Sequence, residues 1–229
     1  MSWKEYFEDY DEGLGTVYER FMIDEYLKRL LSRYDIKKVL EAPVFGMTGV
    51  SGLNSIYFAG NKCAVVLIDN DKERIECIKK VWKEIDQNAE VIYLENFDKL
   101  PFKDNSFDMV WNFCAMENIN EEKLVKEMFR VSSKLVLIIT PNDMNIFNLS
   151  RKSKYKSLKN RFKDNLIEEG VLDIPPWPDT KISIKKKLKN DSKKWRWSIV
   201  DYLKGDEDIK NKAMRFSFIE KMPIPWKIK

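Results

Sequence analysis

The chain has no histidine among its 229 residues. Histidine is the side chain that most often serves as a general base near neutral pH and as a nitrogen ligand for metal ions. Its absence excludes Ser–His–Asp triads, histidine bases and histidine metal sites. Any general base must therefore be a carboxylate, a tyrosine or a lysine, and we expect no metal cofactor.

Cysteine is also scarce. Cys63, Cys77 and Cys114 are scattered without Cys-x-x-Cys spacing, which argues against a disulfide framework or a zinc site. No apolar run approaches the length of a membrane span, and the first residues show no signal-peptide pattern. We therefore expect a cytoplasmic protein that is not attached to a membrane.

Charge of one sign is not in large excess. The 41 Lys and Arg residues face 37 Asp and Glu residues, for a formal net charge of +4. This balance is too mild to indicate nucleic acid or a membrane surface as a partner. We find no repeats and no flexible linker, so residues 1–229 are expected to form one domain, with N-terminal helices (1–37), a core (38–140) and a C-terminal elaboration (141–229).

Residues 38–52 are typical of a strand, a glycine turn and a helix start. The short apolar strand ends in Glu41, and Gly46, Gly49 and Gly52 follow in the turn. Units of this kind hold nucleotide-like ligands at the carboxyl edge of an α/β sheet, because glycine lets the backbone approach the ligand. The spacing is not that of the dinucleotide motif, so an ordinary strand–helix turn is the alternative interpretation.

A second apolar strand is expected at residues 63–69. It is almost continuously apolar, as in a parallel sheet that is covered on both faces. The strand ends at Asp69, where a carboxylate can accept hydrogen bonds from ribose hydroxyls. The alternative is that these acids only cap the next helix, with Asp71 at its N-cap, and both roles are compatible.

Strands and helices continue to alternate up to residue 140. Further strands are expected at residues 91–94, 109–113 and 135–140, and Asn120 is expected to cap the helix before the last of them. Short crossovers of this type predict a Rossmann-like α/β fold, a doubly wound and mostly parallel sheet with helices on both faces.

The N-terminal region predicts an amphipathic helix. Gly13 and Gly15 break an aromatic and acidic segment, and Thr16-x-x-Glu19 matches a capping box. We therefore expect the helix to start at Thr16. Its aromatic residues are explained most simply by core packing, and a lid over the ligand is the functional alternative.

Residues 100–108, Leu-Pro-Phe-Lys-Asp-Asn-Ser-Phe-Asp, precede an apolar strand. This segment closely resembles the one between the third and fourth strands of class I S-adenosylmethionine-dependent methyltransferases. Residues 38–140 as a whole resemble that family in its small, type 11-like form, and residues 141–142 and 173–179 resemble one of its subgroups more loosely.

The resemblance implies S-adenosyl-L-methionine as cofactor and a set of residues that bind it. Glu41 would approach the amino acid end of the cofactor, and Asp69 would bind the ribose hydroxyls. Asn96 would replace the usual aspartate beside the adenine amino group, and Phe97 would cover the ring. The implied set is Glu41, Gly46, Thr48, Gly49, Asp69, Asn70, Asn96, Phe97, Asn112 and Phe113.

The first loop departs from the family pattern. Pro43 stands at the first glycine position, and extra residues precede Gly46. Proline lacks the N–H group and fixes the backbone, so this loop must follow a different path. A non-catalytic binding protein with the methyltransferase fold is therefore an alternative. Cys114 is interpreted as a core thiol, since no Pro-Cys context supports a covalent nucleophile.

The resemblance predicts methyl transfer to a small molecule. Such a reaction depends mostly on alignment, and a base helps only where the acceptor must lose a proton. Glu117 is the candidate base, with a solvated acid at a helix start as the alternative. The basic run at residues 181–196, with interleaved tryptophans, leaves an RNA or protein methyltransferase as the alternative function, although a solvated face explains the run more simply. The sequence gives no indication of oligomeric state.

Overall fold

The computed structural model describes residues 13–44, 52–113, 115–116, 119–139 and 161–162, with only the backbone course for residues 13–22. Residues 27–171 form one compact unit, and residues 1–26 together with 172–229 form another. The strands of the described sheet lie in the first unit.

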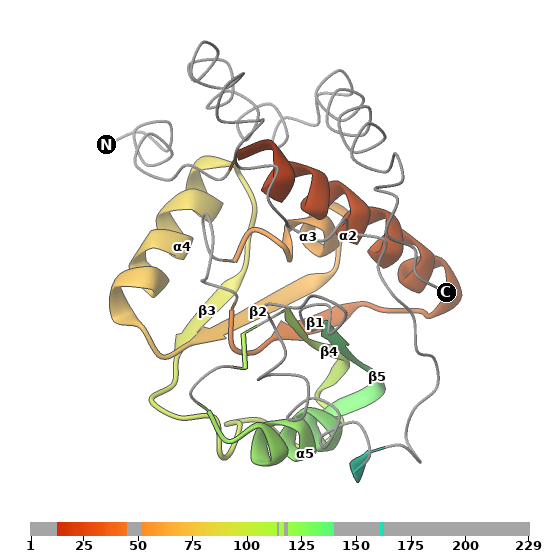
Figure 1. Cartoon of the computed structure of the whole chain (residues 1–229), viewed down its shortest axis with the longest axis vertical. Helices are drawn as coiled ribbons and strands as arrows, with labels where there is room; N and C mark the ends of the chain where they lie inside the picture. The colour runs from red at the N-terminus through yellow and green to blue at the C-terminus, as the bar shows by residue number, and fades with distance from the viewer. Residues whose placement is uncertain (1–12, 45–51, 114, 117–118, 140–160, 163–229) are drawn as a thin grey trace, which may run out of the picture. The chain divides into compact units, whose positions relative to one another are not determined.

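The described sheet is parallel throughout. Its strands, in the spatial order β3-β2-β1-β4-β5 (Figure 1), are β1 (Lys38–Glu41), β2 (Ala64–Asp69), β3 (Glu90–Tyr93), β4 (Phe107–Phe113) and β5 (Ser132–Ile139). The chain moves outward from β1 to β3 and then returns to the other side of β1 to place β4 and β5. This order confirms the predicted Rossmann-like fold, and it puts a topological switch point between β1 and β4, where such sheets bind their ligands.

The described helices are α2 (Gly13–Arg33), α3 (Ile56–Gly60), α4 (Lys72–Glu84) and α5 (Glu121–Val131). Within the unit of residues 27–171, α3 and α4 lie on one face and α5 lies on the other (Figure 1). None of the helices among the described residues has the length and apolarity that crossing a membrane requires.

Two predicted helix caps are confirmed, and one is wrong. Asp71 accepts a hydrogen bond from the backbone N–H of Arg74 at 3.0 Å and caps α4. Asn120 accepts one from the N–H of Lys123 at 3.1 Å and caps α5. The predicted capping box at Thr16 does not start its helix, because α2 begins at Gly13. Glycine lowers helix propensity by only about 1 kcal/mol, which a long helix can tolerate.

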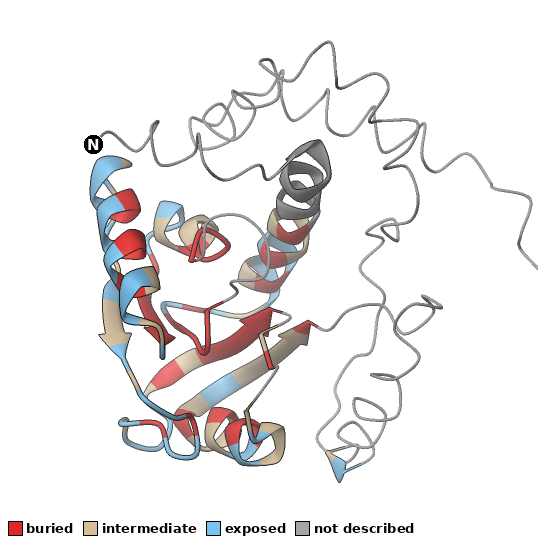
Figure 2. Ribbon diagram, turned by 60° about the vertical axis from the view of Figure 1, so that its left-hand side comes forward, coloured by how far each residue is buried: buried red, intermediate tan, exposed pale blue. Residues whose placement is uncertain are grey.

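The core follows from the sheet order. The strands β2 and β4, inside the sheet, are almost fully buried, whereas the edge strands β3 and β5 are partly exposed (Figure 2). An apolar cluster fills the space towards α5, and it includes Leu40, Val66, Ile68, Phe97, Leu100, Val110, Leu124 and Met128. Cys63 and Cys77 are buried thiols that form no disulfide bond, and Cys114 lies outside the described residues.

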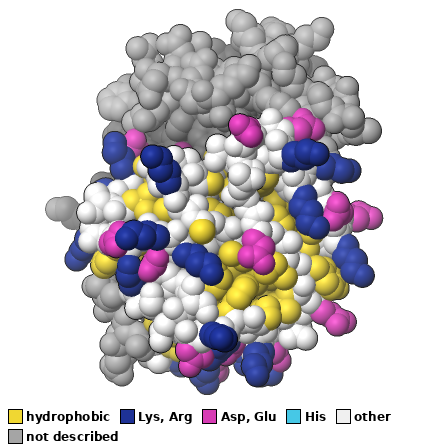
Figure 3. Space-filling view, turned by 180° about the vertical axis from the view of Figure 1, so that it is seen from behind, with side chains coloured by type: hydrophobic (Ala, Val, Ile, Leu, Met, Phe, Trp, Pro, Cys, Tyr) yellow, Lys and Arg dark blue, Asp and Glu magenta, His cyan; other side chains and the backbone are white. Residues whose placement is uncertain are grey.

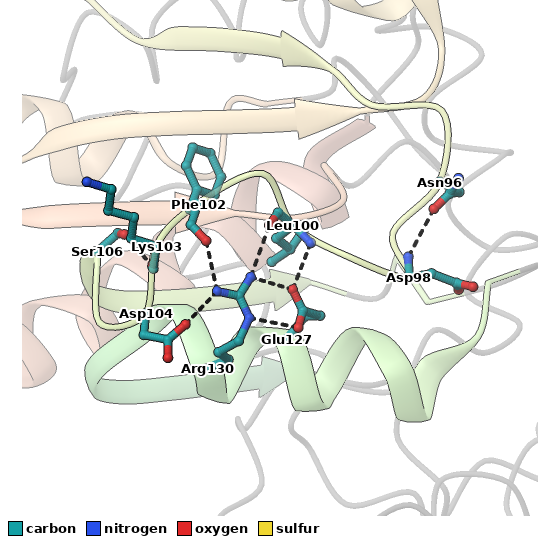
Figure 4. Close-up of polar contacts among 9 residues, drawn as sticks. All are labelled: Asn96, Asp98, Leu100, Phe102, Lys103, Asp104, Ser106, Glu127 and Arg130. Carbon is teal, nitrogen blue, oxygen red and sulfur yellow. Dashed lines mark hydrogen bonds and ion pairs between the residues drawn. The ribbon is translucent and has the colours of Figure 1, made fainter.

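A cluster of charged residues holds the loop between β3 and β4 against α5 (Figure 4). The Arg130 guanidinium donates to the carbonyl oxygens of Leu100 (3.0 Å) and Phe102 (2.8 Å), and it pairs with the carboxylates of Asp104 (2.8 Å) and Glu127 (2.5 Å). The Glu127 carboxylate also accepts the backbone N–H of Leu100 at 2.8 Å. We call these five residues the Arg130 brace.

Residues 100–108, which resemble the methyltransferase segment, are called here the family-like segment, and its remaining residues have equally local roles. Asn105 has a φ of 54°, and its N–H donates to the Arg130 carbonyl at 3.0 Å. Asp108 accepts the backbone N–H groups of Lys37 (2.9 Å) and Lys38 (3.0 Å). The segment that carries the family resemblance therefore fastens the start of β4 to α5 and to the start of β1.

Candidate active site

The acids that end β1 and β2 lie on the same face of the sheet. The register pairs Glu41 with Leu67, and Asp69 follows two residues after Leu67. Side chains in register, and side chains two residues apart on one strand, point to the same face. Glu41 and Asp69 therefore both lie at the carboxyl edge on the α3 and α4 side, and both are fully buried, with 0% exposure.

Asp69 is held by its own helix. One oxygen, Oδ1, accepts the backbone N–H of Asp71 at 2.9 Å, and Oδ2 pairs with the guanidinium of Arg74 at 3.1 Å. Burial raises the pKa of Asp69, although Arg74 and the Asp71 N–H act in the opposite direction. Sequence reasoning missed Arg74. Its position, in the first turn of the helix that follows Asp69, was the signal that could have identified it.

Glu41 is held by two residues that sequence reasoning also missed. The Ser55 hydroxyl donates to Glu41 Oε2 at 2.5 Å, and the indole N–H of Trp111 donates to Ser55 Oγ at 3.1 Å. All three residues are fully buried, with 0% exposure. No short-range pattern links them, because Ser55 lies 14 residues from Glu41 and 56 residues from Trp111.

The Asn112 side chain forms hydrogen bonds with the residues that follow β1 and β4, on the two sides of the switch point. Its Nδ2 donates to the carbonyl oxygens of Ala42 (3.0 Å) and Pro43 (3.3 Å), and its Oδ1 accepts the N–H of Ala115 at 3.2 Å. The side chain is fully buried. Asn112 therefore ties the start of the unusual first loop to the end of β4, and a direct role at the cofactor stays a prediction.

The residues expected near adenine follow the next strands. Asn70 is exposed directly after β2, and the exposed Asn96 accepts the N–H of Asp98 at 3.3 Å in the loop after β3 (Figure 4). Phe97 is only 3% exposed and belongs to the apolar cluster towards α5, and Phe113 is 2% exposed at the end of β4. Core packing thus accounts for Phe97, and the roles of both phenylalanines at the cofactor stay predictions.

Several expected residues lie outside the described part of the chain. These are Gly46, Thr48, Gly49 and Glu117, together with the basic run at residues 181–196 and the proline-containing residues 173–179. Within the described residues, no three His, Cys, Asp or Glu side chains are grouped so that they could hold a metal ion.

Gly52 is the described glycine of the first turn. Its φ is 79°, and a Cβ atom there would lie 3.1 Å from Ile78 and 3.3 Å from Leu67. Its carbonyl oxygen accepts the indole N–H of Trp82 at 3.1 Å. A left-handed backbone and a close approach to α4 both require glycine here, so the turn is packed directly on the helix that follows β2.

Residues 47–139 match the family model of a methyltransferase domain. The match covers β2 to β5, whose order and parallel direction are those of a doubly wound sheet. By this match, residues 47–139 are a methyltransferase domain.

Solved structures of low identity resemble the chain. A SAM dependent methyltransferase from Aquifex aeolicus is 22% identical, with a TM-score of 0.47, over 63% of this chain and 80% of that one. The YcgJ protein from Bacillus subtilis is 23% identical, with a TM-score of 0.40, over 48% of each chain. The PH0226 protein from Pyrococcus horikoshii is 23% identical, with a TM-score of 0.41, over 69% of this chain and 65% of that one.

The chain therefore spans about half the length of the YcgJ protein. No curated protein matches it. The match to a methyltransferase domain concerns residues 47–139, and the sheet order agrees with it.

Proposed function

We propose that the protein transfers a methyl group from S-adenosylmethionine to a small-molecule acceptor. The observation that carries this proposal is the placement of Glu41 and Asp69 at the carboxyl ends of adjacent strands, on one face and fully buried. Two carboxylates in that position suit a ligand with several hydroxyl groups and a positive charge.

The residues present fit this cofactor. A carboxylate has about four lone-pair sites, and the bonds from Asp71 and Arg74 to Asp69 use one on each oxygen. Asp69 therefore has the capacity to accept the ribose hydroxyls. Glu41 would hold the amino acid end, and Asn70 and Asn96 would lie at the adenine end. Gly46, Thr48, Gly49, Phe97, Asn112 and Phe113 complete the proposed set.

The cofactor, when bound, supplies a methyl group on a sulfonium, which is a good leaving group. The protein contributes mainly by orientation, since holding the acceptor atom in line with the methyl group removes most of the entropic barrier. The chain has no histidine, so the side chain that takes the proton of an acceptor that has one to lose is a carboxylate, a tyrosine or a lysine. We propose Glu117, which follows β4, for this role.

A small acceptor agrees with the described surface. On the face shown in Figure 3, basic and acidic side chains are interspersed around an apolar area. The described part of this face has no continuous basic surface of the kind that nucleic-acid binding uses. The residues on which the RNA or protein alternative depends, 181–196, lie outside the described part of the chain.

Calorimetric titration of the full chain with S-adenosylmethionine tests the proposal. We expect saturable binding, and we expect Asp69→Ala to weaken it at least tenfold, about 1.4 kcal/mol. Asp71→Asn is the matched control, because asparagine keeps the helix cap while the second carboxylate beside Arg74 (3.4 Å) is removed. That variant should change the affinity by less than about twofold.

Each negative result has a separate meaning. Absence of binding heat under conditions where the chain is folded would refute the cofactor itself. Unchanged affinity in Asp69→Ala would show that the site is misplaced. Binding without release of S-adenosylhomocysteine, across a panel of small amines, thiols, phenols and acids, would favour the non-catalytic alternative.

A further inference from the structure

Ser55 occupies the N-cap position of α3 without capping the helix. Its side chain makes no capping hydrogen bond, and its backbone has φ −83° and ψ −3°. A serine at an N-cap normally accepts a hydrogen bond from a backbone N–H two or three residues later. The hydroxyl of Ser55 is directed instead to Glu41 Oε2, at 2.5 Å.

The direction of the hydrogen bonds in this chain of three residues is fixed. The indole N–H of Trp111 can only donate, so the Ser55 oxygen must accept it at 3.1 Å. The single hydroxyl hydrogen of Ser55 is then committed to Glu41. A hydrogen bond from a hydroxyl to a carboxylate is short and strong, in agreement with the 2.5 Å separation.

The sheet and a neighbouring ring fix Trp111 in turn. The register pairs Trp111 with Glu41 across β4 and β1, so their side chains lie on the same face. The Trp111 ring meets Phe58 of α3 edge to face, with centroids 5.7 Å apart and an interplanar angle of 73°. All these side chains have 0% exposure, so water does not compete for the hydrogen bonds.

We propose that Ser55 and Trp111 are positioning residues that hold the Glu41 carboxylate in the orientation required by the amino acid end of the cofactor. This inference rests on the proposed function. Glutamate has three side-chain torsions, and a carboxylate that is already fixed does not have to be ordered when the ligand binds. Neither residue touches the reacting atoms in this proposal, since both act through Glu41.

The test compares two ligands that differ only at that end. S-adenosylhomocysteine and 5′-methylthioadenosine share the adenosine and a neutral thioether, but only the first has the amino acid group. We divide the affinity for S-adenosylhomocysteine by the affinity for 5′-methylthioadenosine, both measured by calorimetry. This affinity ratio isolates the contribution of the amino acid group, which is expected to lie at Glu41. We expect Ser55→Ala to lower this ratio at least about fivefold and Trp111→Phe about two- to fivefold, while 5′-methylthioadenosine binding stays within about twofold.

Trp82→Phe is the matched control. Trp82 is 2% exposed and also donates its indole N–H, to the Gly52 carbonyl oxygen at 3.1 Å. Both Trp→Phe changes remove one buried hydrogen bond and a similar volume, but only Trp111 is linked to Glu41. The affinity ratio should stay unchanged in Trp82→Phe, whatever its effect on stability.

Glu41→Gln serves as the reference, and it should lower the ratio most. Adding Ser55→Ala to Glu41→Gln should cost much less than Ser55→Ala alone, because coupled residues are not additive. The proposal is overturned if Ser55→Ala and Trp111→Phe weaken both ligands equally or leave the ratio unchanged. If Ser55→Ala does not fold, Trp111→Phe decides by the same criterion.

The outcomes separate this inference from the function on which it rests. A wild-type chain that binds neither ligand refutes the proposed function. A wild-type chain that binds both ligands equally well contradicts the placement of Glu41 at the amino acid end. The remaining outcome is a wild-type chain that prefers S-adenosylhomocysteine, with a ratio that falls in Glu41→Gln but not in the Ser55 and Trp111 variants. That outcome would overturn only the positioning role of Ser55 and Trp111.

Discussion

Two of the arginine–carboxylate pairs among the described residues behave in opposite ways. On α5, Glu127 binds Arg130 at 2.5 Å, and this hydrogen bond, opposed by burial, lowers the pKa of Glu127. At the end of β2, Asp69 binds Arg74 at 3.1 Å, yet burial raises the pKa of Asp69. The side chain of Glu127 is 16% exposed and that of Asp69 is 0% exposed. Of these two carboxylates, only Asp69 has a pKa on which burial has the dominant effect.

This difference separates a structural pair from a candidate binding group. Glu127 also accepts the Leu100 N–H and is fully engaged in the Arg130 brace. Burial destabilises the charged form of Asp69 by more than Arg74 and the Asp71 N–H stabilise it. Additional hydrogen-bond donors, such as those of a ligand, would therefore stabilise the carboxylate. Carboxylates with raised pKa values in such positions are candidates for functional sites. The brace should consequently govern stability, and the carboxyl edge should govern ligand affinity.

The largest effect is expected from Arg130→Ala. The change removes two bonds to carbonyl oxygens and leaves the half-buried Glu127 without its cation. We expect the free energy of unfolding to fall by about 2–3 kcal/mol and the melting temperature to fall by roughly 5–10 °C. Urea and thermal unfolding measure both. Cofactor affinity at a temperature where the variant is folded should change by less than about twofold.

Lys126→Ala is the control on the same helix. Lys126 pairs with Glu122 at 2.8 Å, but its side chain is 63% exposed, so we expect a change within about 0.5 kcal/mol. If Arg130→Ala weakened cofactor binding as strongly as it weakened stability, the brace and the carboxyl edge would not be separate, and the comparison would fail.

Acidification should affect the two regions in a fixed order. The folded pKa of Asp69 is raised, so cofactor affinity should start to fall while the pH is still above the ordinary aspartate value of about 3.9. The pKa of Glu127 is lower in the folded protein than in the unfolded chain, where it is about 4.3. Its contribution to stability is therefore complete above the unfolded pKa, and it is lost as the pH falls through the folded pKa. Binding should therefore be lost before the fold.

Asp108 reinforces the later, structural step. Burial alone would raise its pKa, but hydrogen bonds from Lys134 and from the Lys37 and Lys38 N–H groups outweigh it and lower the pKa. Titrations from pH 7 to pH 3, followed by calorimetry and circular dichroism, test the order. Asp69→Asn should flatten the pH dependence of affinity, and Glu127→Gln should flatten the acid limb of stability. Simultaneous loss of binding and structure would contradict the assignment.

The sequence predicted the elements that local pattern encodes. Continuous apolar runs located β2 and β4, and the caps at Asp71 and Asn120 were correct because a side chain and the N–H that it binds are three residues apart. The acids at the ends of β1 and β2 were placed on a common edge because parallel strands end together.

The contacts that hold those acids were not predictable in the same way. Ser55 meets Trp111 across 56 residues, and Arg130 reaches the Leu100 carbonyl across 30 residues. Such pairs depend on strand register and helix placement, which one sequence does not specify. The family-like segment indicated the fold rather than the chemistry, because its residues Leu100, Phe102 and Asp104 contact Arg130 in the brace.

The smallest effect on stability is expected at Asn105. Substitutions there test whether the asparagine is present because its backbone is left-handed. Asn105 is exposed and has a φ of 54°, a left-handed conformation that alanine adopts at a cost of about 1 kcal/mol. Asn105→Ala should lower the free energy of unfolding by that amount in urea titrations, whereas Asn105→Gly should stay within about 0.5 kcal/mol, because glycine adopts a positive φ freely.

Asn88→Ala is the control for loss of the amide alone, since Asn88 is exposed and is not among the residues with positive φ. It should change stability by less than about 0.5 kcal/mol. None of these three variants should alter cofactor affinity, because Asn105 acts through its N–H bond to the Arg130 carbonyl. Equal stability of Asn105→Ala and Asn105→Gly would show that the left-handed turn does not explain the asparagine, and the segment would need a role at the carboxyl edge instead.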